Sequence, residues 1–306
     1  MLTPTKKLLL KAQAGNYAVG AFNINNMEIA HAIMEAAERE AAPVICQTSE
    51  GSLAYAGMDM LLAIGRQLAV ASKIPISLHL DHGKHPEVVK EAIRAGYQSV
   101  MYDGSAHPFA RNVEITSEVV KLAHQGGVSV EAELGALSGI EDFVTVRQRD
   151  AHLTNPLQAR EFVKKTRCDF LAIAIGTSHG AYKFTGRSKL DLLRLKEIRS
   201  RVSVPLVLHG ASSVPKSLVK QVEKFGGDLG KPMGVSDRDL RQAVKNGICK
   251  VNTDTDVRLA FTAGIRKILK REPDEFDPRK LLAPAYEEMV AVIRWKIKLL
   301  GSSNKA

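Results

Sequence analysis

The chain is poor in cysteine and aromatic residues and contains no long apolar run. Its 3 cysteines, Cys46, Cys168 and Cys249, are odd in number, lie far apart and form no Cys-x-x-Cys pair. This pattern argues against a disulfide framework or a thiolate metal site, so we expect buried free thiols. No apolar run reaches the roughly 18–20 residues that cross a bilayer, and residues 1–7 lack the order of a secretory signal. We therefore expect a cytoplasmic protein with no membrane partner.

Basic residues outnumber acidic ones by 43 to 33, which gives a formal net charge of +10. An excess of this size suits either a nucleic acid or an anionic small substrate. The lysines and arginines are scattered, with no arginine-rich tract and no interleaved aromatic residues, and residues 266–271 have the spacing of a solvated helix face. We therefore expect a small anionic substrate and no nucleic-acid partner.

Short β-rich runs alternate with longer helical patterns along the chain. The β-rich runs span residues 18–24, 43–49, 75–82, 99–103, 128–134, 170–176, 205–212 and 249–255. Apolar residues recur at helical spacing in residues 28–42, 191–201 and 236–246, and Ser236 is a candidate N-cap. The β-rich runs are apolar nearly throughout, which is typical of parallel strands covered on both faces.

Eight βα units predict an α/β protein with the (β/α)8 TIM-barrel fold. We expect residues 1–306 to form one barrel domain with closing helices at about 278–300. The competing fold, an open doubly wound sheet, usually carries a glycine fingerprint after its first strand, and residues 21–25 contain none.

Polar residues stand where these runs end, and a barrel gathers its catalytic groups at the carboxyl ends of its strands. We therefore expect one rim to carry the following residues: Asn23, Ser49, Asp81, His82, Asp103, Glu131, Glu133, His179, His209, Asn252 and Asp254. His82, His179 and His209 come from three strands, and each is followed by Gly. Three imidazoles with an open fourth position would bind Zn²⁺ for catalysis, although each histidine could instead be structural.

The neighbours of these histidines leave several roles open. Asp81 could orient a ligand or act as a general acid or base. Glu133 could hold the metal or a water on it. His79 and His85 are weaker candidate ligands. Glu141 lies in a Gly-containing segment that could be a closing loop with a base or simply a solvated acidic loop.

Phosphate binding is expected after the last two strands. Residues 210–213 and 252–255 are short turns with Gly or hydroxyl side chains. Barrels often bind phosphate at these two loops through backbone N–H groups and a helix N-terminus.

Five motifs, in this order, are similar to those of one enzyme family: HLDHG at 79–83, EAELG at 131–135, GTSHG at 176–180, LHGAS at 208–212 and KVNTDT at 250–255. The chain resembles the class II, metal-dependent fructose-1,6-bisphosphate aldolases, including the related tagatose-bisphosphate aldolases. The resemblance covers nearly the whole chain, from Ala21 to Arg279.

The resemblance implies a metal site and an oligomer. The ligands would be His82, His179 and His209, with Glu133 contacting the metal in a more buried position. Zn²⁺ is the expected cofactor, with Co²⁺ or Mn²⁺ as alternatives, and a monovalent cation (Na⁺ or K⁺) is expected beside the phosphate. A homodimer or homotetramer is expected.

The resemblance also implies the chemistry, a reversible retro-aldol cleavage of fructose 1,6-bisphosphate through a metal-stabilised enediolate, in glycolysis and gluconeogenesis. Asp81 would act at the C4 oxygen, Glu141 would exchange a proton with dihydroxyacetone phosphate, and Asn252 would contact the enediolate. The implied triose-phosphate contacts are Gly180, Lys183, Gly210, Ser212, Asp254 and Thr255. The implied contacts at the other end of the substrate are Asn23, Ser49 and Arg279, and the arginine can come from a neighbouring subunit.

Three alternatives remain at this point. Lys250, in a predicted strand, could form a Schiff base in place of the metal chemistry. The barrel could be a binding or regulatory protein without activity. The substrate could be tagatose 1,6-bisphosphate, which differs from the fructose sugar only in its C4 configuration.

Overall fold

The computed structural model describes residues 2–135, 138–141, 144–146, 152–179, 190–230 and 232–306, and for residues 138–141, 144–146 and 179 it describes the backbone alone. Eight strands form a closed barrel in the order β1-β11-β10-β8-β5-β4-β3-β2. Neighbouring strands pair in parallel all the way around. The predicted (β/α)8 barrel is therefore confirmed.

Each predicted β-rich run overlaps one barrel strand. The strands are β1 (Val19–Asn23), β2 (Val44–Ser49), β3 (Ile76–Gly83), β4 (Ser99–Tyr102), β5 (Ser129–Leu134), β8 (Phe170–Ile173), β10 (Leu206–Leu208) and β11 (Ile248–Thr253). Their residues are buried throughout, as expected for strands with helices outside and packed side chains inside.

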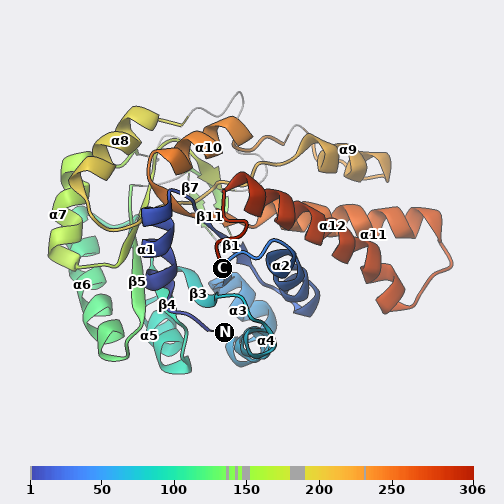
Figure 1. Cartoon of the computed structure of the whole chain (residues 1–306), viewed down its shortest axis with the longest axis horizontal. Coiled ribbons are helices and arrows are strands. Elements are labelled where there is room, and N and C mark those ends of the chain that lie inside the picture. The colour runs from blue at the N-terminus through green and yellow to red at the C-terminus, as the bar shows by residue number, and fades with distance from the viewer. Residues whose placement is uncertain (1, 136–137, 142–143, 147–151, 180–189, 231) are drawn as a thin grey trace.

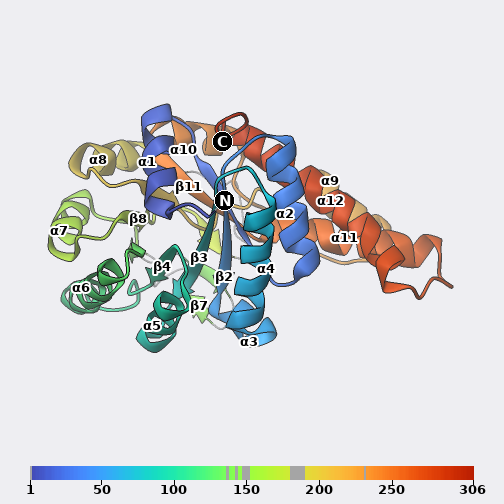
Figure 2. The same cartoon turned by 60° about the horizontal axis from the view of Figure 1, so that its bottom comes forward.

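Helices surround the barrel, and Figures 1 and 2 show them as an outer layer. They are α1 (Thr5–Gly15), α2 (Met27–Arg39), α3 (Glu50–Ala56), α4 (Met58–Ala71), α5 (Pro86–Ala95), α6 (Phe109–Gln125), α7 (Pro156–Thr166), α8 (Leu192–Arg201), α9 (Lys216–Lys224), α10 (Asp237–Lys245), α11 (Thr255–Arg271) and α12 (Pro278–Leu299). The three predicted helical segments are α2, α8 and α10. Ser236 caps α10 as predicted, because its hydroxyl accepts a hydrogen bond from the backbone N–H of Asp239 at 3.1 Å.

The C-terminal helices extend away from the barrel. α11 and α12 pack on each other as an antiparallel pair, and both figures show the turn between them far from the strands. The pair is close because Gly264 lies against Ala285: a Cβ on Gly264 would come within 2.3 Å of the Cα of Ala285. The segment at about 278–300, expected to form closing helices, is the single helix α12.

Two features were not expected from the sequence. Helix α1 packs its Leu8, Leu9 and Ala12 against inward-facing barrel residues such as Val19 and Phe170. A small sheet in the order β7-β6-β9 joins β6 (Ser138–Glu141), β7 (Val144–Val146) and β9 (Ser178–His179). The segment that carries Glu141, expected to be a loop, therefore contains a strand.

The cysteines agree with the expectation of buried free thiols. Cys46, Cys168 and Cys249 are all buried and unpaired. Burial raises the pKa of the Cys46 and Cys168 thiols to about 12. Among the described residues, no helix is both long enough and apolar enough to span a membrane.

Candidate active site

His82 reaches the rim through an irregularity in β3. Asp81 and His82 are neighbours, so in a regular strand their side chains would point to opposite faces. The register of β3 against β4 shifts between Leu80 and Gly83, and His82 has a positive φ of 47°. A Cβ at Gly83 would lie 2.5 Å from the carbonyl oxygen of Met101, so only glycine fits after the histidine. Bulges and strained residues of this kind are common beside active sites.

This irregularity brings His82 close to His209, which follows β10. The two ring centroids are 4.4 Å apart, edge to face. Together with Asp81 they form a group whose ligand atoms lie within 4.8 Å of one another. Oε2 of Glu133 lies 3.7 Å from Nδ1 of His82 and 3.6 Å from Nδ1 of His209. Four residues predicted from strand ends are thus brought together.

These donors fit a divalent metal ion, because imidazole nitrogen and carboxylate oxygen are ligands that Zn²⁺ prefers. Burial, and after it the nearby His82, lowers the pKa of His209 below its ordinary value of 6.5, which favours the neutral ring that binds a metal ion. Nε2 of His209 lies 2.7 Å from Oε1 of Glu131, and Nδ1 of His82 lies 3.1 Å from Oδ2 of Asp103. Carboxylates in these positions fix the orientation of a ligating imidazole and raise its basicity.

Asp81 is held by two amide groups. Nε2 of Gln47 donates to Oδ2 at 2.8 Å, and Nδ2 of Asn252 donates to Oδ1 at 2.9 Å. Gln47 also donates to Oδ1 of Asn23 at 2.7 Å, so a chain of hydrogen bonds runs from β1 through β2 and β3 to β11. Each oxygen of Asp81 retains further acceptor capacity. The fixed carboxylate can therefore take a proton from a bound hydroxyl group.

A second polar layer lies two residues earlier on the same strands. Nζ of Lys250 lies 2.8 Å from Oε2 of Glu131, and Nε2 of His79 lies 3.4 Å from the same oxygen, with all three side chains fully buried. Burial alone would raise the pKa of Glu131, but Lys250 and His209 hold that pKa well below its ordinary value. Glu131 is thus a charged carboxylate that contacts the imidazole of His209 from the inner layer. Lys250 compensates the charge of Glu131.

Comparison with known proteins identifies the family. The chain matches the family model "Fructose-bisphosphate aldolase class-II" over residues 3–305. It is 49% identical over 308 residues to the fructose-bisphosphate aldolase of Helicobacter pylori and 49% identical over 306 residues to that of Thermus caldophilus, with 100% of each chain covered. The chain belongs to the class II fructose-bisphosphate aldolases. The YdjI aldolase from Escherichia coli K12 has the same fold, with a TM-score of 0.83 at 32% identity and 100% of both chains covered.

Membership of this class makes the chain a metal-dependent lyase, and the predicted resemblance is confirmed. The Schiff-base alternative is excluded by the class, and the structure gives the physical reason. A Schiff-base lysine must present a neutral amine to the carbonyl. Lys250 instead neutralises Glu131 and lies 3.9 Å from Oδ1 of Asp81.

The three residues predicted to contact the distal end of the substrate do not lie together. Asn23 and Ser49 are both buried at strand ends. The hydroxyl of Ser49 accepts a hydrogen bond from the backbone N–H of Ser52 at 3.3 Å, so it also caps α3. Arg279 is elsewhere: its side chain is 89% exposed in the first turn of α12, where it pairs with Asp277. Arg279 directly follows the turn between α11 and α12, which lies far from the barrel strands (Figures 1 and 2).

The predicted phosphate contacts follow β10 and β11. Gly210 has a positive φ of 58°, and a Cβ there would lie 2.6 Å from the carbonyl oxygen of Ser178. Only glycine therefore allows this loop to approach β9 so closely. Ser212 is buried in the same loop. Asp254 and Thr255 stand at the N-terminus of α11.

Some predicted residues cannot be placed in full. Gly180 and Lys183 lie outside the described residues. For His179 and Glu141 only the backbone is described, in β9 and β6, and these two strands pair in parallel with Gly139 opposite His179. The strands carrying His179 and Glu141 are therefore neighbours.

Asp103 and Glu131 were expected at the rim without a specific role, and Glu131 instead lies in the inner layer. Gln47 was not expected at the site, and Lys250 was considered only as a rival nucleophile. A signal for the inner layer was present. Polar residues recur two positions apart at Gln47 and Ser49, His79 and Asp81, Glu131 and Glu133, and Lys250 and Asn252. Residues two apart on a strand share a face, so four such pairs indicate a polar barrel interior.

Proposed function

We propose that the chain catalyses the reversible cleavage of fructose 1,6-bisphosphate to dihydroxyacetone phosphate and glyceraldehyde 3-phosphate, a step of glycolysis and gluconeogenesis. The observation that carries this proposal is a carboxylate, Asp81, fixed by two amide donors with ligand atoms of His82 and His209 within 4.8 Å. Full-length relatives named fructose-bisphosphate aldolase support the choice of substrate.

Asp81 would accept the proton of the C4 hydroxyl as the C3–C4 bond breaks. Its amide partner Asn252 would contact the triose fragment on which negative charge develops. Glu141 would then return a proton to the carbon of that fragment. The pairing of β6 with β9 supports this last role, because it places the strand of Glu141 beside the strand of His179.

We propose Zn²⁺ as the metal, held by His82, His179 and His209, with Glu133 as an additional contact. When bound, the ion would supply Lewis acidity toward the substrate oxygens. Co²⁺ and Mn²⁺ are the alternatives, because metal availability as well as affinity decides occupancy. A monovalent cation, Na⁺ or K⁺, would sit beside the phosphate.

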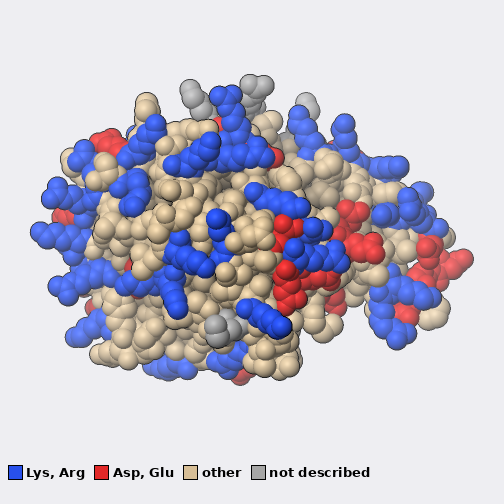
Figure 3. Space-filling view, viewed as in Figure 1, with Lys and Arg blue, Asp and Glu red and all other residues tan. Residues whose placement is uncertain are grey.

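The anionic ends of the substrate would bind on opposite sides of the metal. The triose phosphate would contact Gly180, Lys183, Gly210, Ser212, Asp254 and Thr255. The N-terminus of α11 supports this assignment, because helix N-termini favour anions. Figure 3 shows Lys and Arg side chains scattered over the viewed face rather than gathered into one tract, which supports a small anionic substrate over a nucleic acid.

The distal phosphate would lie near Asn23 and Ser49 and would be bound by Arg279 of a neighbouring subunit. Arg279 is 89% exposed in the first turn of α12, and the turn between α11 and α12 lies far from the strands of its own barrel (Figure 1). Both observations support a homodimer or homotetramer in which this turn reaches another copy. We also propose a cytoplasmic location, which the three free cysteines support.

One assay tests the function: cleavage of the fructose and tagatose bisphosphates with and without a chelator. We expect preference for the fructose sugar, loss of activity on metal removal and recovery with Zn²⁺. Full activity after complete metal removal would refute the mechanism. A preference for the tagatose sugar would change the substrate and leave the mechanism standing.

A further inference from the structure

A buried ion pair lies directly behind the loop expected to bind the triose phosphate. Nζ of Lys296, near the end of α12, is 2.9 Å from Oδ2 of Asp256, in the first turn of α11, and both side chains are fully buried. Removing two charges from water is unfavourable, so such a pair is weak evidence for stability. Its contacts point to a different role.

Both partners bind the end of the same loop, residues 210–214, which we call the phosphate loop. The backbone N–H groups of Ser213 and Val214 donate to the two carboxylate oxygens of Asp256, at 3.0 Å and 2.8 Å. Nζ of Lys296 donates to the hydroxyl of Ser213 at 2.8 Å. Three hydrogen bonds from one ion pair therefore fix two consecutive residues of the phosphate loop.

The phosphate loop needs this support because its backbone is strained. Val214 has a positive φ of 49°, which is costly for a β-branched residue. One flank of the loop is closed by residues 234–235: Val235 donates its N–H to the carbonyl of Ser212 at 3.0 Å, and a Cβ on Gly234 would come within 2.3 Å of that oxygen. The ion pair secures the remaining, C-terminal end.

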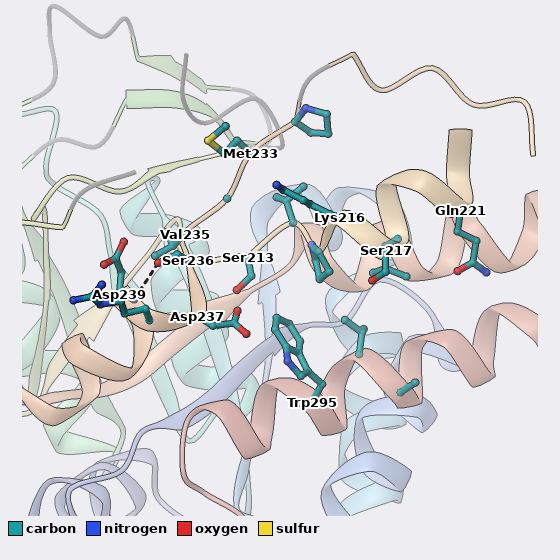
Figure 4. Close-up of a pocket in the computed structure, with 18 of the residues that line it drawn as sticks. Ser213, Lys216, Ser217, Gln221, Met233, Val235, Ser236, Asp237, Asp239 and Trp295 are labelled. Carbon is teal, nitrogen blue, oxygen red and sulfur yellow. Dashed lines mark hydrogen bonds between the residues drawn. The ribbon is translucent and has the colours of Figure 1, made fainter. Parts of the chain in front are cut away.

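A cavity borders the phosphate loop at Ser213 and Val214. The cavity has a volume of about 1440 Å³, and Ser213, Val214 and Trp295 are among its lining residues. Figure 4 shows Ser213 above Trp295, with Met233 on the opposite wall. A phosphate loop released from Asp256 and Lys296 would have open space into which to relax.

The ion pair also joins the two elements that carry the predicted phosphate contacts. Asp256 directly follows Asp254 and Thr255 on α11, while its carboxylate binds the loop that contains Gly210 and Ser212. The close packing of Gly264 on Ala285 sets the register that brings Lys296 opposite Asp256. We propose that Asp256 and Lys296 are positioning residues that hold the phosphate loop in the conformation that binds the phosphate of the triose half.

This inference rests on the proposed phosphate site, so the test separates the two. The measurements are the Kd for inorganic phosphate, the KM and kcat for fructose 1,6-bisphosphate, and the zinc content of the holoenzyme. The variants are Lys296→Met, the double variant Asp256→Asn/Lys296→Met, and Ser212→Ala as a direct change at the site. Lys298→Met is the matched control, because Lys298 lies on the same helix with its side chain 57% exposed and pairs with Glu40 at 3.3 Å.

We expect Lys296→Met to raise the phosphate Kd and the KM by about tenfold or more, because small displacements of positioning groups have effects of this size. The zinc content should not change, kcat should fall by less than KM rises, and Lys298→Met should behave as wild type. If Lys296→Met does not fold, the double variant decides the question, because it leaves no lone buried charge. The double variant should show the same rise in the phosphate Kd, about tenfold or more.

Two results would overturn the inference by different routes. If Ser212→Ala weakens phosphate binding but the double variant binds phosphate and substrate like wild type, the phosphate site stands and the positioning role is wrong. If the wild-type holoenzyme neither cleaves fructose 1,6-bisphosphate nor binds phosphate, the proposed function fails and the inference fails with it.

Discussion

Replacing Glu131 with Gln tests how the inner polar layer supports the metal site. The substitution removes the charge that lies 2.8 Å from Nζ of Lys250 and keeps an oxygen that can accept from His209. Leaving a buried charge without its partner costs about 3–5 kcal/mol. Asp81 remains as a weaker partner, because its Oδ1 lies 3.9 Å from Nζ of Lys250. We therefore expect the loss of stability to lie near the lower limit of this range. At about 2 °C per kcal/mol, Tm should fall by roughly 6 °C.

The metal site should respond to the same change, but less strongly. Loss of a carboxylate behind a ligating histidine typically costs about 10–100-fold in metal affinity. Because Gln keeps an acceptor for Nε2 of His209, we expect a loss of about tenfold, near the lower end of that range. Competition with a chromophoric chelator measures the zinc affinity, and thermal unfolding of the metal-free protein measures the stability separately.

A double-mutant cycle gives the refuting result. Glu131→Gln/Lys250→Met removes both charges, and a buried pair replaced in this way is often neutral for stability, so Tm should return close to wild type. The matched control is the exposed pair of Glu161 and Lys165, 2.7 Å apart, where Glu161→Gln/Lys165→Met should change stability by less than about 0.5 kcal/mol. Additive losses in the buried pair, with the double variant less stable than either single one, would show that Glu131 and Lys250 do not act as an ion pair.

Three further predictions follow from the site and the core. Asp81→Asn should lower kcat by about 10²–10⁴-fold without loss of zinc, and zinc loss measured by atomic absorption would instead make Asp81 an orienting residue. The metal-free protein should lose stability as pH falls below about 6.5, because folding lowers the pKa of His79 and His209 below the values of the unfolded chain. A second loss should occur below about 4.5, because folding also lowers the pKa of Glu131. A Tm that does not change between pH 7.5 and 5 would contradict this prediction. Iodoacetamide should leave the folded protein unmodified, because burial raises the pKa of Cys46 and Cys168 to about 12 and that of Cys249 to about 11, and all three thiols should react after unfolding, as mass spectrometry can verify.

The barrel could be predicted because its signal is local. Each barrel strand is a short apolar run, and such runs recur between helical patterns, so their number and order determine the fold class. Strands β6, β7 and β9 have no such signal. They are short and lie outside the barrel, and β6 pairs with a segment about 40 residues away, as in Gly139 opposite His179. Helix α1 was missed for a different reason: its buried face covers the interior of the barrel, which appears only once the strands have closed.

At the site, the sequence predicted that Asp81, His82 and His209 come together but not how they do so, and it placed Glu131 at the rim although Glu131 lies in the inner layer. The strand-end rule alone cannot place both Asp81 and His82 in one site, since neighbours on a regular strand face opposite ways. The bulge before Gly83 and the positive φ of His82 resolve that conflict. The conflict itself was visible in the sequence: two adjacent functional residues at a strand end require an irregular backbone, and the glycine that follows them is where it can occur.

The residues that support the site differ in how well the sequence predicts them. The layer of His79, Glu131 and Lys250 could have been found from polar residues two apart on several strands, because alternation is a property of each strand by itself. The pair of Asp256 and Lys296 could not. Their contact depends on the register of two helices joined by a turn, and that register is set by the packing of Gly264 on Ala285. The role of a buried lysine on an amphipathic helix depends on which side chain of the partner helix lies opposite it. Residues that position a loop are therefore harder to predict from sequence than residues that contact the substrate.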